Sequence, residues 1–202
     1  NGLSIGNICI DKYVEAKLNS LIDKYGEGEL KVNIKIDEEF SSEFDAYELN
    51  IDKEINIVAV NNDAAYYALL TLEQILSQIE SDKLLRKLEI HDFANQKIRG
   101  VIEGYYGIPW GNKKRADIMK FTSKFKGNVF IFAPKDDPYH RDKWYELYPK
   151  EELEEISRLA RLGESIKTRY VWTISPFKKD SSPIEEDNFE ESVVKLLDKF
   201  NQ

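Results

Sequence analysis

The stretch RGVIEGYYGIPWG, residues 99–111, combines residue types that could bind a small polar ligand. One carboxylate, Glu103, stands among glycines, two tyrosines and a tryptophan at the end of a short apolar run. Glycine lets the backbone approach a ligand closely or adopt a positive φ. Aromatic rings suit a sugar, because its C–H faces pack on rings while its hydroxyls need hydrogen bonds. The stretch is therefore either a sugar-binding loop around Gly104 or a tight turn with aromatic residues in the core.

A second stretch, APKDDPYHRDKW at residues 133–144, directly follows another apolar run. The ammonium of Lys135 could donate hydrogen bonds to ligand hydroxyls there. Asp136 and Asp137 are a poor acid–base pair, because adjacent side chains of an extended chain point to opposite sides. His140 has no suitably spaced His, Cys or carboxylate around it, so no metal site is expected. Two prolines and three aromatics favour an ordered loop, although a merely solvated one is the alternative.

Composition excludes several classes of function. The chain has 202 residues, of which 42% are apolar, and a net charge of −8, which argues against nucleic acid or an anionic membrane as the partner. Its single cysteine, Cys9, cannot form an intrachain disulfide and leaves the cellular compartment open. No apolar run approaches the roughly 18 residues that a membrane span needs. Because the chain starts at Asn1 without a signal-peptide pattern, we expect a processed product or a part of a longer protein.

Residues 1–96 are expected to form a small α+β domain, a sheet with helices on one face. His91 stands alone in a strand pattern, so we assign it a structural role. The predicted elements are a helix that ends at Gly26, a strand at 31–36, a hairpin of 46–51 and 55–60, a helix at 64–79 capped by Asp63, and a strand at 87–93.

Residues 97–202 show three successive strand–loop–helix units, with apolar strands typical of parallel strands buried on both faces. Such folds place their chemistry in the loops after the strands. A barrel of eight units needs about 250 residues, so these residues supply about three units. The predicted strands are 97–103, 128–133 and 169–175. The predicted helices are 113–126, burying Ile118, Met119, Thr122 and Phe125; 150–166; and a last helix capped by Asp187 and Glu190.

The segments RGVIEGYYGIPW, NVFIFAPKDDPYHRDKW and YVWTISP resemble glycoside hydrolase family 84, whose pattern runs EGFYG-x-PW, YAPKDDPYHR and ISPG. That family includes bacterial β-N-acetylglucosaminidases, clostridial enzymes described as hyaluronidases, and animal O-GlcNAcases. The segment DAAYYALLTLEQIL resembles the family's N-terminal domain, which is similar to the small α+β domain of family 20 hexosaminidases. The resemblance covers essentially the whole chain. Phe177 departs from the family glycine, and Tyr105 replaces a phenylalanine.

The resemblance implies an α/β fold, in which residues 1–96 form the small domain and residues 97–202 begin a (β/α)8 TIM-type barrel. It implies a retaining hydrolase in which the substrate's own acetamido group forms an oxazoline. Gly104 would offer its backbone, and Lys135 its ammonium, to the N-acetylglucosamine, while Asp136 and Asp137 order their loop. The catalytic aspartate pair is expected beyond Gln202, so this chain would contain no catalytic residue. No metal or organic cofactor is implied.

The implied partner is a glycan that contains N-acetylglucosamine, and the implied location is secreted or at a bacterial cell surface. An incomplete barrel exposes a sheet edge, which favours self-association. The chain alone is expected to be inactive. Two alternatives are a non-catalytic carbohydrate-binding or scaffold relative, for which Phe177 argues, and an unrelated doubly wound α/β binding protein.

Overall fold

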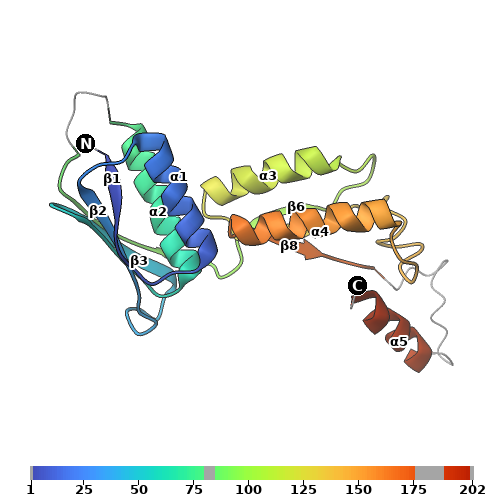
Figure 1. Ribbon diagram of the computed structural model, residues 1–202. Coiled ribbons are helices and arrows are strands. Elements are labelled where there is room, and N and C mark those ends of the chain that lie inside the picture. Colours follow the sequence, from blue (N-terminus) through green and yellow to red (C-terminus); the bar gives the residue numbers. More distant parts are fainter. Residues whose placement is uncertain (1, 80–84, 176–188, 201–202) are drawn as a thin grey trace. The chain divides into compact units, whose positions relative to one another are not determined.

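The computed structural model describes residues 2–79, 85–175 and 189–200 (Figure 1). The chain divides into two compact units, Asn1–Ile98 and Arg99–Gln202. This division falls two residues after the boundary that the sequence analysis expects between residues 96 and 97.

The first unit contains a five-stranded sheet with the strand order β1-β2-β4-β3-β5. Neighbours β1, β2 and β4 are parallel, whereas β3 is antiparallel to both β4 and β5, so the predicted β3–β4 hairpin is confirmed. The elements are β1 (Leu3–Ile8), α1 (Lys12–Tyr25), β2 (Leu30–Ile36), β3 (Phe44–Ile51), β4 (Ile55–Ala59), α2 (Asn62–Ser77) and β5 (Leu88–Ala94).

Strand β1 is absent from the sequence-based prediction. Its sequence LSIGNI contains a glycine and an asparagine, which are depleted in strands, and its pairing with β2 shifts register between Ile5 and Ile8. The strand forms because its partner β2 supplies the backbone hydrogen bonds, which no local pattern reveals.

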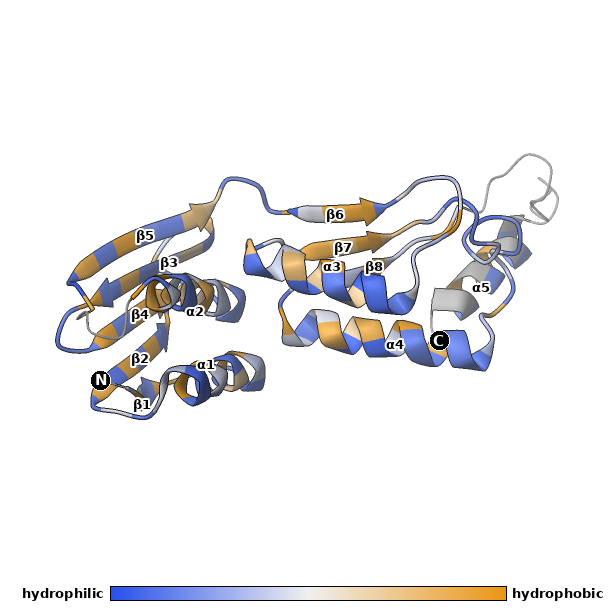
Figure 2. Cartoon of the chain, turned by 90° about the horizontal axis from the view of Figure 1, so that it is seen from above, coloured by the Kyte–Doolittle hydropathy of each residue, from blue (hydrophilic) through white to orange (hydrophobic). Residues whose placement is uncertain are grey.

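Both helices of the first unit lie on the same side of the sheet, as predicted (Figure 2). Helix α1 buries the periodic apolar face expected for it and ends at Gly26, whose φ of 90° suits glycine. Helix α2 begins earlier than predicted. Its N-cap is Asn61, whose side chain accepts a hydrogen bond from the Ala64 N–H, so the prediction of Asp63 as the cap is wrong. Asp63 instead lies in the first turn, where a negative charge favours the helix dipole.

The second unit contains a parallel three-stranded sheet with the order β6-β7-β8, as predicted from its apolar strands. The strands are shorter than expected. The elements are β6 (Gly100–Glu103), α3 (Asn112–Lys124), β7 (Val129–Phe132), α4 (Lys150–Ser165), β8 (Arg169–Trp172) and α5 (Phe189–Phe200). Asp187 of the expected capping box and Phe177 lie outside the described residues.

The core of this unit lies on one face of its sheet. Phe130 and Phe132 are buried with Met119 of α3 and Leu159 of α4. On the other face Ile102 is 59% exposed and Val171 is 36% exposed. The expectation of burial on both faces therefore fails for the described residues, because α3 and α4 cover only one face.

Helix α3 also differs from its predicted buried face. Phe125 is 69% exposed, not buried, because the helix ends at Lys124 and Phe125 already belongs to the following turn. Its ring packs on the exposed ring of Phe121, with centroids 5.0 Å apart. Within the described ranges, no helix has the length and apolar character to cross a membrane.

Candidate functional site

The loops after β6 and β7 are joined at the carboxyl edge of the second sheet. The Ala133 N–H donates to the Glu103 carbonyl at 3.0 Å, and the Lys135 N–H donates to the Tyr105 carbonyl at 3.0 Å. These bonds continue the strand pairing into the loops. Two segments that the sequence separates therefore lie beside each other, and they contain both predicted sugar-binding residues, Gly104 and Lys135.

Gly104 is the first residue after β6 and is half-buried, as is Lys135. A Cβ at Gly104 would lie 3.2 Å and 3.3 Å from side-chain atoms of Ile102. The positive-φ position of the loop is Gly107, at 107°. The Gly107 N–H donates to the Asp136 carboxylate at 2.7 Å, which ties the two loops together a second time.

Glu103, the carboxylate of the opening stretch, is fully buried and holds the start of the glycine loop. Its two carboxylate oxygens accept a fork of hydrogen bonds from Arg115 of α3, at 2.7 Å from Nε and 3.0 Å from Nη2. One of them also accepts the Trp110 N–H at 2.8 Å. Asn112 accepts from a third guanidinium nitrogen, and the guanidinium lies 4.6 Å from the centre of the Phe132 ring.

This buried pair is electrostatically satisfied. Burial by itself lowers the pKa of the Arg115 guanidinium, but the hydrogen bonds and charge of Glu103 outweigh burial, so the pKa is raised above its usual value. Arg115 therefore stays charged, and Glu103 serves as the anchor between β6, its loop and α3. Glu103 was noted from the sequence, whereas Arg115 was missed. The signal that could have found Arg115 is an opposite charge 12 residues after Glu103, in the helix that follows the strand and its loop.

Asp137 orders the second loop, as the family resemblance implies. One carboxylate oxygen accepts the backbone N–H of Tyr139 at 2.8 Å, and the other accepts the Tyr148 hydroxyl at 3.2 Å. The Tyr148 oxygen in turn accepts the indole N–H of Trp172 at 3.2 Å. Burial raises the pKa of the Tyr148 hydroxyl, and the charge of Asp137 raises it further, so this phenol remains a donor. This network joins the loop to the end of β8.

His140 fastens the same loop to the segment after β8. It is 3% exposed, its Nδ1 lies 2.9 Å from the Thr173 carbonyl, and its own carbonyl accepts the Ser175 N–H at 2.7 Å. Its buried Nε2 has no hydrogen-bond partner within the described part of the chain. Because Nδ1 faces a carbonyl, Nδ1 bears the hydrogen of a neutral ring.

A cavity of about 390 Å³ lies between the two joined loops and the start of α4. Trp110, Arg115, Asp137 and Ile156 contribute to its lining, whereas Gly104 and Lys135 do not. The predicted sugar-binding residues therefore lie outside this cavity. Arg115, the partner of Glu103, is the member of the anchor that lines this cavity.

We expect the stability of the chain to fall as the pH drops below about 6.5 because of His140. Burial lowers the pKa of His140, and the charges of Lys135 and Arg141 lower it as well. The hydrogen bond to the Thr173 carbonyl and the charge of Asp137 raise it, but the lowering effects are larger. The unfolded chain therefore binds this proton at higher pH than the folded chain, and stability is lost progressively toward the lower folded pKa.

The measurement is the free energy of unfolding between pH 7.5 and 5.5, above the range in which most carboxylates titrate. The decrease of this free energy with falling pH should become smaller in His140→Asn. It should remain in His91→Asn, which replaces the only other histidine of the chain. Equal slopes in all three proteins would contradict the assignment.

The chain is similar to known proteins. The family model described as beta-N-acetylglucosaminidase matches residues 99–202. Protein O-GlcNAcase of Rattus norvegicus and that of Mus musculus are each 35% identical over 83 residues, 41% of this chain and 9% of the relative. The solved structure of CpGH84D superposes with a TM-score of 0.85 at 32% identity, over 99% of this chain and 38% of that chain. That of CpGH84B gives a TM-score of 0.81 at 26% identity, with the same coverage.

The chain thus spans less than half the length of each of these relatives. The superposition extends over both units, and the family model covers the unit that contains the joined loops.

Proposed function

Because this chain belongs to glycoside hydrolase family 84 and corresponds to the family's N-terminal region, we propose that it forms part of a retaining β-N-acetylglucosaminidase. The observation that supports this most directly is the pair of joined loops after β6 and β7. They place Gly104 and Lys135 at one edge of a parallel sheet, where barrel enzymes bind their substrates. We further propose that the three parallel strands begin a (β/α)8 barrel that is completed by other residues of the whole protein, and that this protein is secreted or displayed at a bacterial cell surface.

In the proposed reaction this chain binds and orients the sugar. The Gly104 backbone and the Lys135 ammonium hydrogen-bond hydroxyls of a terminal N-acetylglucosamine, and the buried anchor of Glu103 and Arg115 keeps their loops fixed. A fixed sugar favours attack of its acetamido oxygen on its own anomeric carbon, because the reacting atoms are already close. An aspartate pair outside this chain would orient the acetamido group and protonate the leaving oxygen.

The test compares the complete protein with the 202-residue chain on p-nitrophenyl N-acetyl-β-glucosaminide. We expect the complete protein to release the chromophore and first form the β-anomer of the sugar, as NMR of the early product would show, and the 202-residue chain to be inactive. An α-anomer product would overturn the retaining mechanism. A complete protein that binds N-acetylglucosamine without hydrolysis would be the non-catalytic relative instead.

Replacing Lys135 with alanine in the complete protein should lower kcat/KM roughly 10- to 100-fold, since a hydrogen bond to a charged group contributes about 1.5–3 kcal/mol. The matched control is Lys113→Ala, whose side chain is 90% exposed and pairs with Asp117 on the surface of α3. Steady-state kinetics with thermal unfolding of both variants measure the effect. Equal kinetics of the two variants would make Lys135 an ordinary surface residue.

The exposed face of the second sheet bears Ile102 and Val171, both accessible to solvent. We propose that further strands of the barrel cover this face in the complete protein, and that the 202-residue chain by itself associates through it. Sedimentation velocity should show oligomers of the chain that Ile102→Lys reduces to monomers. A monomeric wild-type chain at about 100 μM would contradict this proposal.

A further inference from the structure

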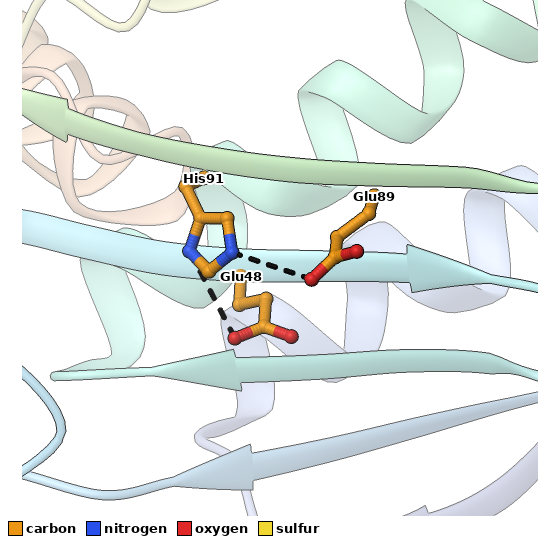
Figure 3. A group of neighbouring side chains, drawn as sticks. All are labelled: Glu48, Glu89 and His91. Carbon is orange, nitrogen blue, oxygen red and sulfur yellow. Dashed lines mark ion pairs between the residues drawn. The ribbon is translucent and has the colours of Figure 1, made fainter.

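Three potential metal ligands gather on the face of the first sheet opposite its helices (Figure 3). Strand register places Glu48 of β3 directly opposite His91 of β5, and Glu89 lies two residues before His91 on the same face of the strand. The Glu48 carboxylate is 3.8 Å from Nδ1 of His91, and the Glu89 carboxylate is 3.6 Å from Nε2. Both carboxylates therefore face the same imidazole ring.

The arrangement suits a small divalent cation better than a bare ion pair. One ligand atom from each of the three residues can be chosen so that all lie within 4.8 Å of one another. Ligands about 2.0–2.2 Å from a tetrahedral ion stand roughly 3.3–3.6 Å apart. One ring nitrogen of His91 would bind the ion, and the carboxylate that now faces the other nitrogen would turn toward it. The side chains of Glu89 and His91 are 65% and 62% exposed and can make this movement by rotation.

Two lysines near this face have aspartates as their hydrogen-bond partners, although the charge of Glu89 also acts on Lys87. The ammonium of Lys87, just before β5, binds Asp52 at 2.9 Å. The ammonium of Lys35, on β2, binds Asp37 at 2.7 Å. Two carboxylates and an imidazole offer the charge and the donor atoms that Zn²⁺ and similar ions prefer.

We propose that Glu48, Glu89 and His91 form a surface site for a divalent first-row transition metal ion such as Zn²⁺, with water in the remaining positions. The ion would tie the edge strand β5 to β3 through their side chains. Since β5 pairs with β3 alone among the strands that the structure describes, this link would stabilise the edge of the sheet. His91 was assigned a structural role because it stands alone in its strand pattern, and only the β3–β5 register brings Glu48 to it.

The test is isothermal titration of ZnCl₂ into the 202-residue chain with Cys9→Ser, which removes the one exposed thiol. The other histidine, His140, is buried, so an exposed imidazole site can only involve His91. We expect one ion per chain and a rise in melting temperature with Zn²⁺, because a ligand that binds the folded state stabilises it. The variant His91→Ala should bind at least 10-fold more weakly and lose the rise.

Glu48→Gln and Glu89→Gln should each weaken binding, whereas Glu43→Gln, an exposed glutamate at the start of β3, should not. The absorption spectrum of bound Co²⁺ should be lost in His91→Ala. Binding with unchanged affinity in His91→Ala, or no saturable binding below about 1 mM Zn²⁺, would overturn the proposal. All these variants change exposed or half-buried side chains, and a melting curve without metal confirms that each one folds.

Discussion

Glu103→Ala is expected to destabilise the second unit by about 3–5 kcal/mol, the usual cost of removing one partner from a buried ion pair. The Arg115 side chain is 11% exposed and would keep its charge beside Phe132 without the carboxylate that now accepts two of its hydrogen bonds. The Trp110 N–H would lose its acceptor as well. The loop that begins with Gly104 should therefore loosen together with the start of α3.

Urea unfolding followed by tryptophan fluorescence measures this effect, because Trp110, Trp144 and Trp172 all belong to the second unit. The matched control is Asp117→Ala, which breaks the exposed pair with Lys113 on the same helix and should cost less than about 1 kcal/mol.

The double variant Glu103→Ala with Arg115→Ala gives a further check. It should cost less than the sum of the two single changes, because removing both charges leaves neither one buried alone. Additive losses, or a loss for Glu103→Ala no larger than that for Asp117→Ala, would show that the pair does not anchor the loop.

Phe130→Ala should destabilise the second unit by about 3–5 kcal/mol, since it leaves a cavity in a packed core. Phe130 is fully buried in the middle of β7, and its ring stacks on that of Tyr170 with centroids 5.8 Å apart. The loop with Lys135 begins immediately after this strand, so loss of the packing should also weaken sugar binding in the complete protein.

Phe121→Ala is the control, because this phenylalanine of the same unit is 60% exposed and its removal should change stability by less than about 1 kcal/mol. The fluorescence-detected unfolding described above applies to both variants. Similar losses for the two would mean that β7 is not the centre of the core.

Local patterns determined much of this protein. The apolar spacing of α1 and the glycine after it defined a helix and its end, because the helical period and the left-handed cap are local properties. The apolar runs at β7 and β8 indicated parallel strands, and the motifs that follow β6, β7 and β8 indicated the family. The family resemblance named Gly104 and Lys135, and both follow strands of one parallel sheet, whose loops meet at one edge. Their role in binding sugar stays a prediction.

Only the tertiary structure decided which distant groups meet. Arg115 meets Glu103 because α3 packs back against the sheet, and His140 meets Thr173 because β8 lies beside β7. The register of β3 against β5 brought Glu48 to His91. Each of these pairs depends on long-range packing, hydrogen bonding or strand register, which periodicity within a short segment does not encode.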